Sequence, residues 1–346
     1  MRVALIGFGL AGSVFHAPLV AATSGLRLKA VVTADPERSR QVEEQYPAVT
    51  VFDNAGRLWE RGEEFDLVVV ASPNRTHVPL ALAALRAGLH VVVDKPLAAT
   101  AGGGRSLTEE ARARGLMLTP FHNRRWDGDF LTVRGLLARG ELGRVLRFES
   151  RFERWRPLPK PGWRQSGEAG DAGGLLYDLG SHLIDQALLL FGPAREVYAE
   201  LDPFYEGAAT DNDSFVALTH EGGVRSHLWM STSAAQPGPR FRVLGSRAAY
   251  TKFGLDVQEG ALKLGARPGG QGWGEEEESR WGLLGAGEDL RPVRTEPGGY
   301  QRFYEGVVAA IREGAPPPVE PADAVAVLEV IEAARLSHAE GQTVRL

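Results

Sequence analysis

Apolar residues in the first third of the chain occur in short β-branched runs, separated by longer segments rich in alanine and leucine. Such runs are typical of parallel strands that helices cover on both faces. Strands that alternate with helical segments predict repeated strand–helix units and hence a parallel sheet. The expected strands are Val3 to Ile6, Leu28 to Thr33, Leu67 to Ala71, Val91 to Val93 and Leu116 to Thr119.

The hydrophobic pattern changes after about residue 122. Leu146, Phe148, Ser150 and Phe152 occupy alternate positions, which predicts a strand with one buried face. Residues 213–220 and 224–232 flank the turn sequence Glu221-Gly-Gly223, and this arrangement predicts a hairpin. We therefore expect the second half to be an α+β domain with a largely antiparallel open sheet and helices on one face.

The rest of the second half carries weaker patterns. A further strand pair is expected around Gly245, within residues 240–253, and helices are expected over residues 130–138, 300–313 and 321–337. Residues 265–299 are rich in glycine and glutamate and weakly periodic, so we expect irregular surface structure there. A chain of 346 residues exceeds what one core usually serves. The predicted domains are an α/β Rossmann domain over residues 1–121 and the α+β domain over residues 122–346.

Composition narrows the classes of function. With 24% charged residues and a formal net charge of -5, the chain offers no general attraction for nucleic acid. The absence of cysteine excludes disulfides, cysteine-ligated zinc and thiol nucleophiles. No window approaches the roughly 20 apolar residues of a membrane span, and the N-terminus runs into a strand without a signal-peptide pattern. We expect a cytoplasmic protein without nucleic-acid or membrane partners.

A glycine-rich loop follows the first expected strand and opens a helix. In Gly7-Phe8-Gly9-Leu10-Ala-Gly12, backbone N–H groups at the helix start can hold a pyrophosphate, and side chains at the glycines would block its approach. A turn that serves packing alone is the alternative. The strand context favours a dinucleotide site at these residues.

The end of the second expected strand bears on the choice of cofactor. An acid at this position binds the ribose 2'-hydroxyl in NAD sites, but the aligned residue here is Thr33. Asp35 precedes Pro36, where we expect it to cap a helix. A small hydroxyl with Arg38 nearby tolerates a 2'-phosphate, so we predict NADP. If the strand ends two residues later, Asp35 binds the ribose and NAD is preferred instead.

Five further segments carry polar residues at the ends of expected elements or near the expected domain boundary. They are Phe15-His-Ala-Pro18, Ala71-Ser-Pro-Asn74-Arg-Thr-His77, Val93-Asp94-Lys95-Pro96, Phe121-His-Asn-Arg-Arg-Trp126 and Tyr177-Asp178-Leu-Gly180-Ser-His182-Leu-Ile-Asp185.

With these motifs in this order, nearly the whole chain resembles the Gfo/Idh/MocA oxidoreductases, which include glucose–fructose oxidoreductase and inositol dehydrogenases. The family's Glu-Lys-Pro motif appears as Asp94-Lys95-Pro96, and its Asp-x-x-x-His motif appears as Asp178 and His182. Aspartate in place of glutamate is common in the branch with NADP-dependent scyllo-inositol dehydrogenases, which the segments at Phe15 and Phe121 resemble most. The resemblance implies hydride transfer between nicotinamide and a sugar or polyol, and a homodimer or homotetramer.

The resemblance implies that Lys95, Asp178 and His182 form the catalytic group, and their chemistry agrees. Removing a hydride from a secondary alcohol requires a base for the hydroxyl proton, and histidine titrates nearest neutrality. Asp178, one helical turn before His182, could bind the hydroxyl and bias the imidazole. Lys95 follows a strand at the edge where parallel sheets bind ligands, and its ammonium can stabilise an alkoxide.

Each of these residues has an alternative role. Lys95 could be a solvated loop residue. Asp178 and His182 could be a polar pair on a helix or two metal ligands, although no third ligand is evident and we expect no metal.

The remaining candidates border the same site in the resemblance. Ser72, Asn74 and His77 occupy the loop that the family uses beside the nicotinamide ribose, and Asp94 with Lys95 is expected to contact the cofactor; Asn74 could instead cap a helix. Residues expected to border the substrate are Asn123, Arg124, Trp163 and Arg164, together with Asp178 and His182. The arginines could bind hydroxyls or an acidic group, or form ion pairs between the domains.

Two other functions fit the same motifs. A nucleotide- or sugar-sensing regulatory protein would keep the fold without needing proton-transfer groups. Among enzymes, the family also contains biliverdin reductases, dihydrodiol dehydrogenases and aldose oxidoreductases, and substrate choice depends on loop shape.

Overall fold

The computed structural model describes residues 1–156 and 167–346, which fall into two compact units. The first unit comprises residues 1–123, 258–273 and 299–325, and the second comprises residues 124–257, 274–298 and 326–346. Segments late in the chain therefore contribute to both units.

The first unit is built on a six-stranded sheet in the order β3-β2-β1-β4-β5-β6, with every neighbouring pair parallel. The order reverses between β1 and β4, so the crevice at the carboxyl ends of these strands is the usual ligand position of such sheets. The strands are β1 (Arg2–Ile6), β2 (Arg27–Val32), β3 (Thr50–Phe52), β4 (Leu67–Val70), β5 (His90–Asp94) and β6 (Leu118–Phe121). The expected Rossmann sheet is confirmed, with β3 added.

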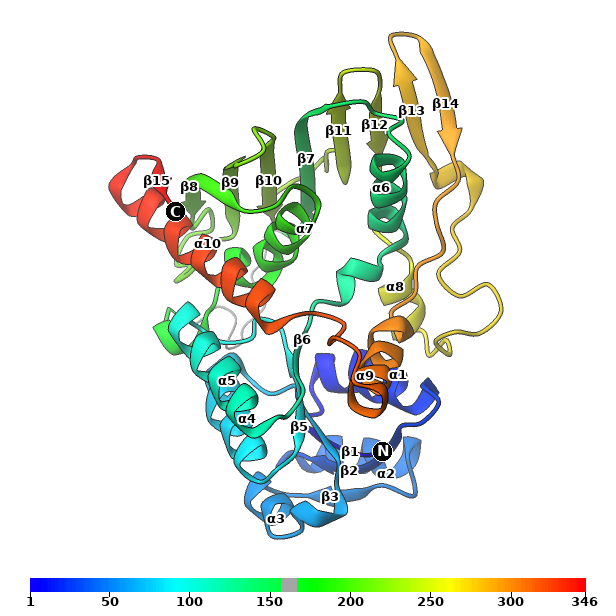
Figure 1. Ribbon diagram of the computed structural model, residues 1–346, viewed down its shortest axis with the longest axis vertical. Helices are drawn as coiled ribbons and strands as arrows, with labels where there is room; N and C mark the ends of the chain where they lie inside the picture. The colour runs from blue at the N-terminus through cyan, green and yellow to red at the C-terminus, as the bar shows by residue number, and fades with distance from the viewer. Residues whose placement is uncertain (157–166) are drawn as a thin grey trace. The chain divides into compact units, whose positions relative to one another are not determined.

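Helices lie on both sides of this sheet, α4 and α5 on one side and α1 and α9 on the other (Figure 1). Apolar residues of β1, β4 and β5 are almost fully buried between them, as the continuous apolar runs require. The helices are η1 (Ala11–His16), α1 (Ala17–Ala22), α2 (Pro36–Gln45), α3 (Ala55–Trp59), η2 (Gly62–Glu64), η3 (Asn74–Thr76), α4 (His77–Arg86), α5 (Ala101–Arg114), α8 (Gln258–Lys263) and α9 (Gln301–Glu313).

The second unit contains a nine-stranded sheet in the order β14-β13-β12-β11-β7-β10-β9-β8-β15. Among the strands that the structure describes, only β7 and β10 pair in parallel, so the expected largely antiparallel sheet is confirmed. The strands are β7 (Val145–Glu153), β8 (Ala194–Asp202), β9 (Asp213–His220), β10 (Arg225–Ser231), β11 (Phe241–Gly245), β12 (Ala249–Lys252), β13 (Gly282–Ala286), β14 (Asp289–Val293) and β15 (Val344–Arg345).

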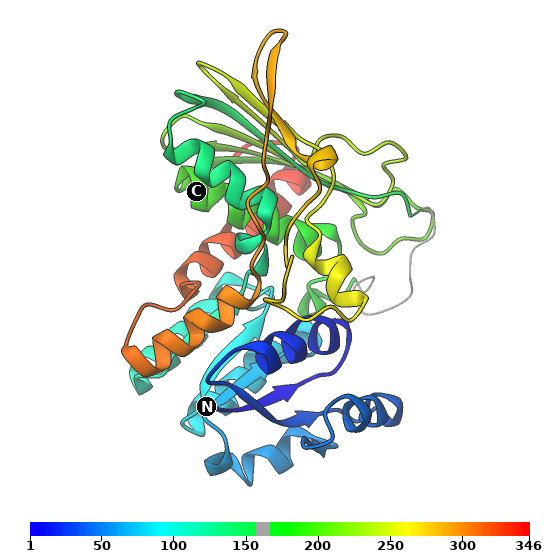
Figure 2. The same cartoon turned by 90° about the vertical axis from the view of Figure 1, so that its right-hand side faces the viewer.

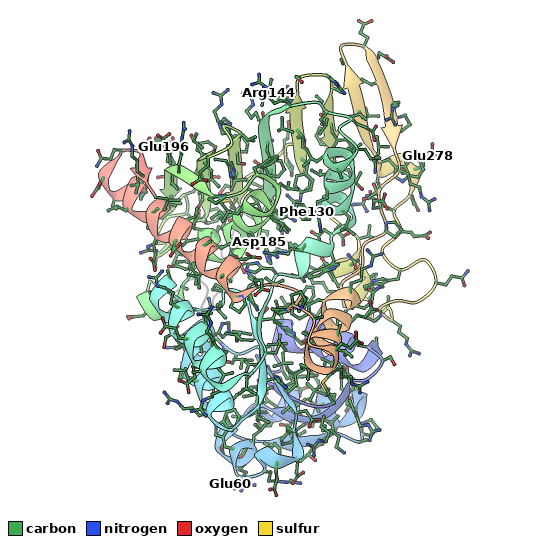
Figure 3. All side chains as sticks on the ribbon, in the orientation of Figure 1. Glu60, Phe130, Arg144, Asp185, Glu196 and Glu278 are labelled. Atoms are coloured by element: carbon green, nitrogen blue, oxygen red, sulfur yellow. The ribbon has the colours of Figure 1, made fainter. Side chains whose placement is uncertain are left out.

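Helices α6, α7 and α10 lie along one face of this sheet (Figure 2). Buried Phe130 and Asp185 lie inside the second unit, whereas Arg144 and Glu278 project from its surface (Figure 3). The remaining helical segments are η4 (Asn123–Trp126), α6 (Gly128–Ala138), η6 (Ala169–Asp171), η7 (Leu176–Gly180), α7 (Ser181–Phe191), η8 (Glu278–Arg280) and α10 (Pro321–Glu340).

The expectation of irregular structure over residues 265–299 is wrong for residues 282–293 and holds for most of the remainder. This stretch contains the hairpin of β13 and β14, which extends the sheet at its edge. Four of the five residues of β14 are exposed, so the hairpin is held by backbone pairing and carries little hydrophobic alternation. Helix α8 and strand β8 also lie where no element was expected.

Among the residues that the structure describes, no helix is long and apolar enough to cross a membrane.

Candidate active site

The glycine loop after β1 is shaped by two positions that admit no side chain. Gly7 has a φ of +99°, and a Cβ there would lie 2.4 Å from the carbonyl oxygen of Ala71 at the end of β4. A Cβ at Gly12 would lie 2.1 Å from the carbonyl oxygen of Gly7. These glycines let the loop turn tightly from the sheet into a helix.

The third glycine leaves open space at the start of the helix that follows. The nearest atom to a Cβ at Gly9 would be Nη1 of Arg38, at 3.9 Å. The helical turn η1 begins two residues later, so backbone N–H groups are available at a helix start, the usual place for a pyrophosphate. Phe8 is buried and packs edge-on against Tyr46, while Leu10 is 53% exposed. Gly9 and the helix start thus form a cradle that a side chain would fill.

Asp35, which follows β2, caps the next helix as expected from the sequence. Its Oδ1 accepts hydrogen bonds from the backbone N–H groups of Glu37 (2.9 Å) and Arg38 (3.3 Å), so it caps α2. Its Oδ2 lies 3.3 Å from Nε of Arg38. Thr33 is buried at the strand end and its Oγ1 accepts from the Asp35 N–H at 3.3 Å. The guanidinium of Arg38 is the cation that lies against the glycine loop.

His77, expected to contact the cofactor, lies between two loops of the first unit. Its ring is fully buried, with Nδ1 2.8 Å from the carbonyl oxygen of Pro96 and Nε2 2.9 Å from that of Ser72. Because both nitrogens face carbonyls, the ring links the loop after β4 to the loop after β5. Ser72 and Thr76 hydroxyls lie 2.6 Å apart, and Asn74 is buried beside them in η3.

Asp94 and Lys95 lie at the carboxyl end of β5, where β5 meets β4. The peptide between Lys95 and Pro96 is cis. Burial alone would raise the pKa of Asp94, but the His16 contact and the charges of His16, Lys95 and His77 outweigh it and hold that pKa below its usual range. The site therefore keeps an ionised carboxylate next to the proposed catalytic lysine.

Asp178 and His182 lie on one continuous helix of the second unit. Asp178 belongs to η7, a π-helical turn, and His182 belongs to the first turn of α7. The sequence predicted an ordinary α-helical turn between them; the structure widens it, and π-helical turns recur at functional sites. Asp178 is half-buried and His182 is 5% exposed.

The start of this helix is held by a half-buried carboxylate that the sequence did not reveal. Oδ2 of Asp211 accepts from the backbone N–H of Leu176 at 2.8 Å and from the Ser214 hydroxyl at 2.6 Å. A Cβ at Gly174, which has a φ of +91°, would lie 1.9 Å from Oδ1 of Asp211. Burial nevertheless raises the pKa of Asp211 above its usual value. Asp211 thus fixes the turn that carries Asp178.

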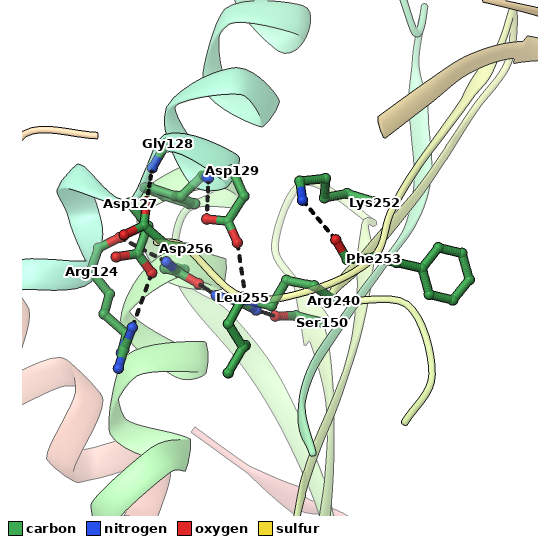
Figure 4. Close-up of polar contacts among 12 residues, drawn as sticks. Arg124, Asp127, Gly128, Asp129, Ser150, Arg240, Lys252, Phe253, Leu255 and Asp256 are labelled. Carbon is green, nitrogen blue, oxygen red and sulfur yellow. Dashed lines mark hydrogen bonds and ion pairs between the residues drawn. The ribbon is translucent and has the colours of Figure 1, made fainter. Parts of the chain in front are cut away.

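The next turn of α7 is anchored by two arginines. Asp185 forms a buried ion pair with Arg125, with Nη2 2.6 Å from Oδ1 and Nε 2.9 Å from Oδ2. Gln186 accepts from Nη2 of Arg240 at 2.9 Å. Arg240 is itself buried, donating to Ser150 at 2.6 Å and lying 3.4 Å from Asp129 (Figure 4). These contacts fix the rotation of the helix that presents His182.

The remaining candidates for substrate contact have separate positions. The Arg124 guanidinium lies 4.6 Å from the centre of the Phe152 ring and 3.4 Å from Asp127, its partner in Figure 4. Asn123, at the start of η4, is buried in the first unit. Trp163 and Arg164 lie outside the described residues. Among the residues described, no group of three or more histidine, aspartate or glutamate side chains is arranged to hold a metal ion.

Comparison with known proteins assigns both halves of the chain. Residues 1–122 match the Gfo/Idh/MocA description "Oxidoreductase family, NAD-binding Rossmann fold", and residues 134–346 match "Oxidoreductase family, C-terminal alpha/beta domain". YdgJ, an uncharacterized oxidoreductase of Escherichia coli strain K12, is 41% identical over 336 residues, spanning 96% of this chain and 94% of its own.

A functionally named relative also spans the full chain. IolW of Bacillus subtilis strain 168, a scyllo-inositol 2-dehydrogenase (NADP(+)), is 33% identical over 350 residues, covering 100% of this chain and 96% of its own. The structure of the putative oxidoreductase yvaA from Bacillus subtilis superposes with a TM-score of 0.92 at 33% identity, covering 100% of this chain and 99% of that one. The chain therefore belongs to the Gfo/Idh/MocA family of oxidoreductases and carries the family's Rossmann domain for a nicotinamide cofactor.

Proposed function

We propose that the protein is an NADP-dependent dehydrogenase that moves a hydride between nicotinamide and a secondary alcohol carbon of a polyol, such as an inositol, or of an aldose. The observation that carries the proposal is the joint presence of Lys95 at the ligand edge of the first sheet and of Asp178 and His182 on one anchored helix. The name of the relative IolW supports the class of substrate. Residues 1–121 would bind the cofactor, and residues 122–346 would bind substrate and form the oligomer.

The residues of the first unit fit a dinucleotide. Gly9 and the start of η1 leave room for a pyrophosphate beside backbone N–H groups, and the Arg38 guanidinium lies at the same loop. Bound nicotinamide accepts the hydride in oxidation and returns it in reduction. Ser72 and Asn74 lie between β4 and α4, and we propose that they border the nicotinamide ribose.

The protein's own side chains handle the proton. In the oxidative direction His182 takes the hydroxyl proton, while the ammonium of Lys95 stabilises the negative charge that develops on the oxygen. Asp178 accepts a hydrogen bond from a substrate hydroxyl and orients it. Asn123 and Arg124 are proposed to bind further hydroxyls, which would explain a preference for polyhydroxylated substrates.

The test of this function is a panel of polyols and aldoses, with scyllo-inositol first, mixed with each oxidised cofactor while the absorbance of reduced nicotinamide is followed. We expect turnover with at least one inositol and faster turnover with NADP. The same panel with Lys95→Ala supplies the blank for contaminating enzymes. Tight NADPH binding without turnover of any member would favour the regulatory, non-catalytic alternative.

The cofactor preference gives a separate prediction at the end of β2. Thr33→Asp should reverse the ratio of kcat/KM for NADP over NAD, because a carboxylate repels the 2'-phosphate and accepts hydrogen bonds from the ribose hydroxyls. Thr33→Asn, similar in size but uncharged, is the matched control and should retain a preference for NADP. A wild-type preference for NAD would place the ribose contact elsewhere than at Thr33 and Arg38.

The oligomer is a further part of the proposal. The face of the second sheet opposite its helices carries Phe215, His227 and Trp229 in mutual contact, with the Arg151 guanidinium 3.8 Å from the centre of the Trp229 ring. Half-buried aromatic residues on such a face are typical of protein interfaces. We propose a homodimer or homotetramer that uses this face.

Trp229→Glu is expected to convert the oligomer to a monomer, because the substitution removes an aromatic ring from the interface and makes a carboxylate lose its water there. Light scattering after size-exclusion chromatography measures the mass. Phe204→Glu, at an exposed apolar residue on a loop, is the control and should leave the mass unchanged. A monomeric wild-type protein would contradict the interface.

A further inference from the structure

We propose that His16 is a positioning residue for Lys95, acting through the carboxylate of Asp94. The proposal rests on the proposed function, because it concerns the lysine to which that function assigns the stabilisation of charge. It gives a role to the Phe15-His-Ala-Pro18 segment, which the proposed reaction leaves unused.

His16 ends the π-helical turn η1 and its ring is fully buried. Nδ1 lies 2.6 Å from the hydroxyl oxygen of Tyr304, a fully buried residue of α9. The ring packs against Phe121, at the end of β6, with 4.3 Å between the ring centres. His16 is therefore held by two elements that lie far from it in the sequence.

The other ring nitrogen faces Asp94. Nε2 lies 3.5 Å from Oδ1 of Asp94 and, among the described residues, has no hydrogen-bond partner. A separation of 3.5 Å is longer than a full hydrogen bond, so the contact is mainly electrostatic. A buried N–H group is costly to leave without a polar neighbour. The Asp94 carboxylate is therefore the group with which this nitrogen interacts.

The contacts of His16 indicate which of its ring nitrogens carries the proton. Burial and the charge of Asp94 raise the pKa of Tyr304 well above its ordinary value, so its hydroxyl stays protonated. If Nδ1 of His16 carried the proton, a neutral ring would turn its lone pair toward the carboxylate. The favourable arrangement has the Tyr304 hydroxyl donating to Nδ1 and the Nε2–H of His16 pointing at Asp94.

Both chain neighbours of Lys95 are thus held by buried histidines. Nε2 of His16 lies 3.5 Å from Oδ1 of Asp94, and Nδ1 of His77 lies 2.8 Å from the Pro96 carbonyl oxygen. The positive charge of Lys95 helps to lower the pKa of Asp94, so the carboxylate that His16 contacts also interacts electrostatically with the lysine. Loss of the His16 contact would leave the charges of Lys95 and His77 as the remaining opposition to burial at Asp94, which raises the pKa of Asp94 and weakens the hold of its carboxylate on the lysine.

Two substitutions of similar shape separate this role from simple packing. An asparagine amide reaches about as far as Nδ1 and can keep the Tyr304 contact, whereas a glutamine amide reaches farther and can present an N–H to Asp94. We expect His16→Asn to lower kcat by about ten- to hundredfold, the range for a misplaced catalytic group. His16→Gln should stay within a few-fold of wild type, and the Kd for NADPH should change in neither.

A double-mutant cycle tests whether His16 acts through Asp94. The His16→Asn/Asp94→Asn protein should be no slower than the slower single variant, because both changes remove the same interaction. Multiplied losses in the double variant would overturn the proposal. If His16→Asn does not fold, Tyr304→Phe, which removes one hydroxyl, replaces it in the cycle and should lower kcat by a few-fold.

NMR of ¹⁵N-labelled histidine gives a readout that does not require turnover. The chain has 8 histidines, and the His16→Gln spectrum assigns the His16 signals by their loss. We expect the Nε2–H tautomer in the wild type and a shifted Nδ1 signal in Tyr304→Phe; an Nδ1–H tautomer would overturn the array. Absence of polyol turnover with the expected tautomer would contradict the proposed function alone. Full kcat in His16→Asn, with wild-type turnover present, would contradict the positioning role alone.

Discussion

Lys95→Ala is expected to lower kcat by about a hundredfold or more, the loss typical of removing one electrostatic stabiliser of a developing oxyanion. The loss should appear in both kcat and kcat/KM for the polyol, because the interaction forms only as charge develops on the oxygen. The Kd for NADPH, measured by fluorescence, and the melting temperature should remain near wild-type values.

Two controls define what this result means. Lys29→Ala removes an exposed lysine of β2 and should leave kcat unchanged. Lys95→Arg keeps the charge but alters its geometry, so it should recover part of the lost activity at most. Near-normal turnover in Lys95→Ala would reduce Lys95 to a loop residue.

The sheet of the first unit could be predicted because its strands have a local signature. Buried parallel strands such as β4 appear as continuous apolar runs, and each of the five expected segments overlaps a strand. β3 has three residues, too few to establish a period. The β13–β14 hairpin lacks a buried face over most of its length, and Pro292 in β14 further disguises a strand. Backbone pairing at a sheet edge leaves little trace in the hydrophobic pattern.

The sequence likewise predicts some features of the candidate site and misses others. The glycine loop and the Asp178–His182 pair are visible because each is compact in sequence. The contacts that support them are not local: His16 and Tyr304 are separated by 288 positions, and Asp211 meets Leu176 across 35. The sequence places His77 after an expected strand, but only the fold shows that its ring joins two loops. Local motifs thus identify reactive groups, and tertiary structure identifies what holds them.

His182→Asn is expected to slow oxidation by roughly a hundredfold to ten-thousandfold, the span for a lost general base. If His182 accepts the hydroxyl proton, its protonated form is inactive. The wild-type kcat/KM should then fall as the pH becomes low enough to protonate the imidazole. The asparagine amide occupies the place of the part of the imidazole nearest the helix, and it is polar but cannot accept the proton. The acidic limb should therefore be absent from the residual activity of His182→Asn.

The comparison between variants matters more than the wild-type curve, because interacting groups share apparent pKa values. His338→Asn, at a histidine of α10 whose Nδ1 accepts from the Leu201 N–H at 3.2 Å, is the matched control and should keep both the rate and the acidic limb. Asp178→Asn should slow turnover while retaining the limb, since it alters how the substrate is oriented and leaves the imidazole in place. Full activity of His182→Asn with an unchanged acidic limb would assign the proton to another residue and contradict the mechanism at its central step.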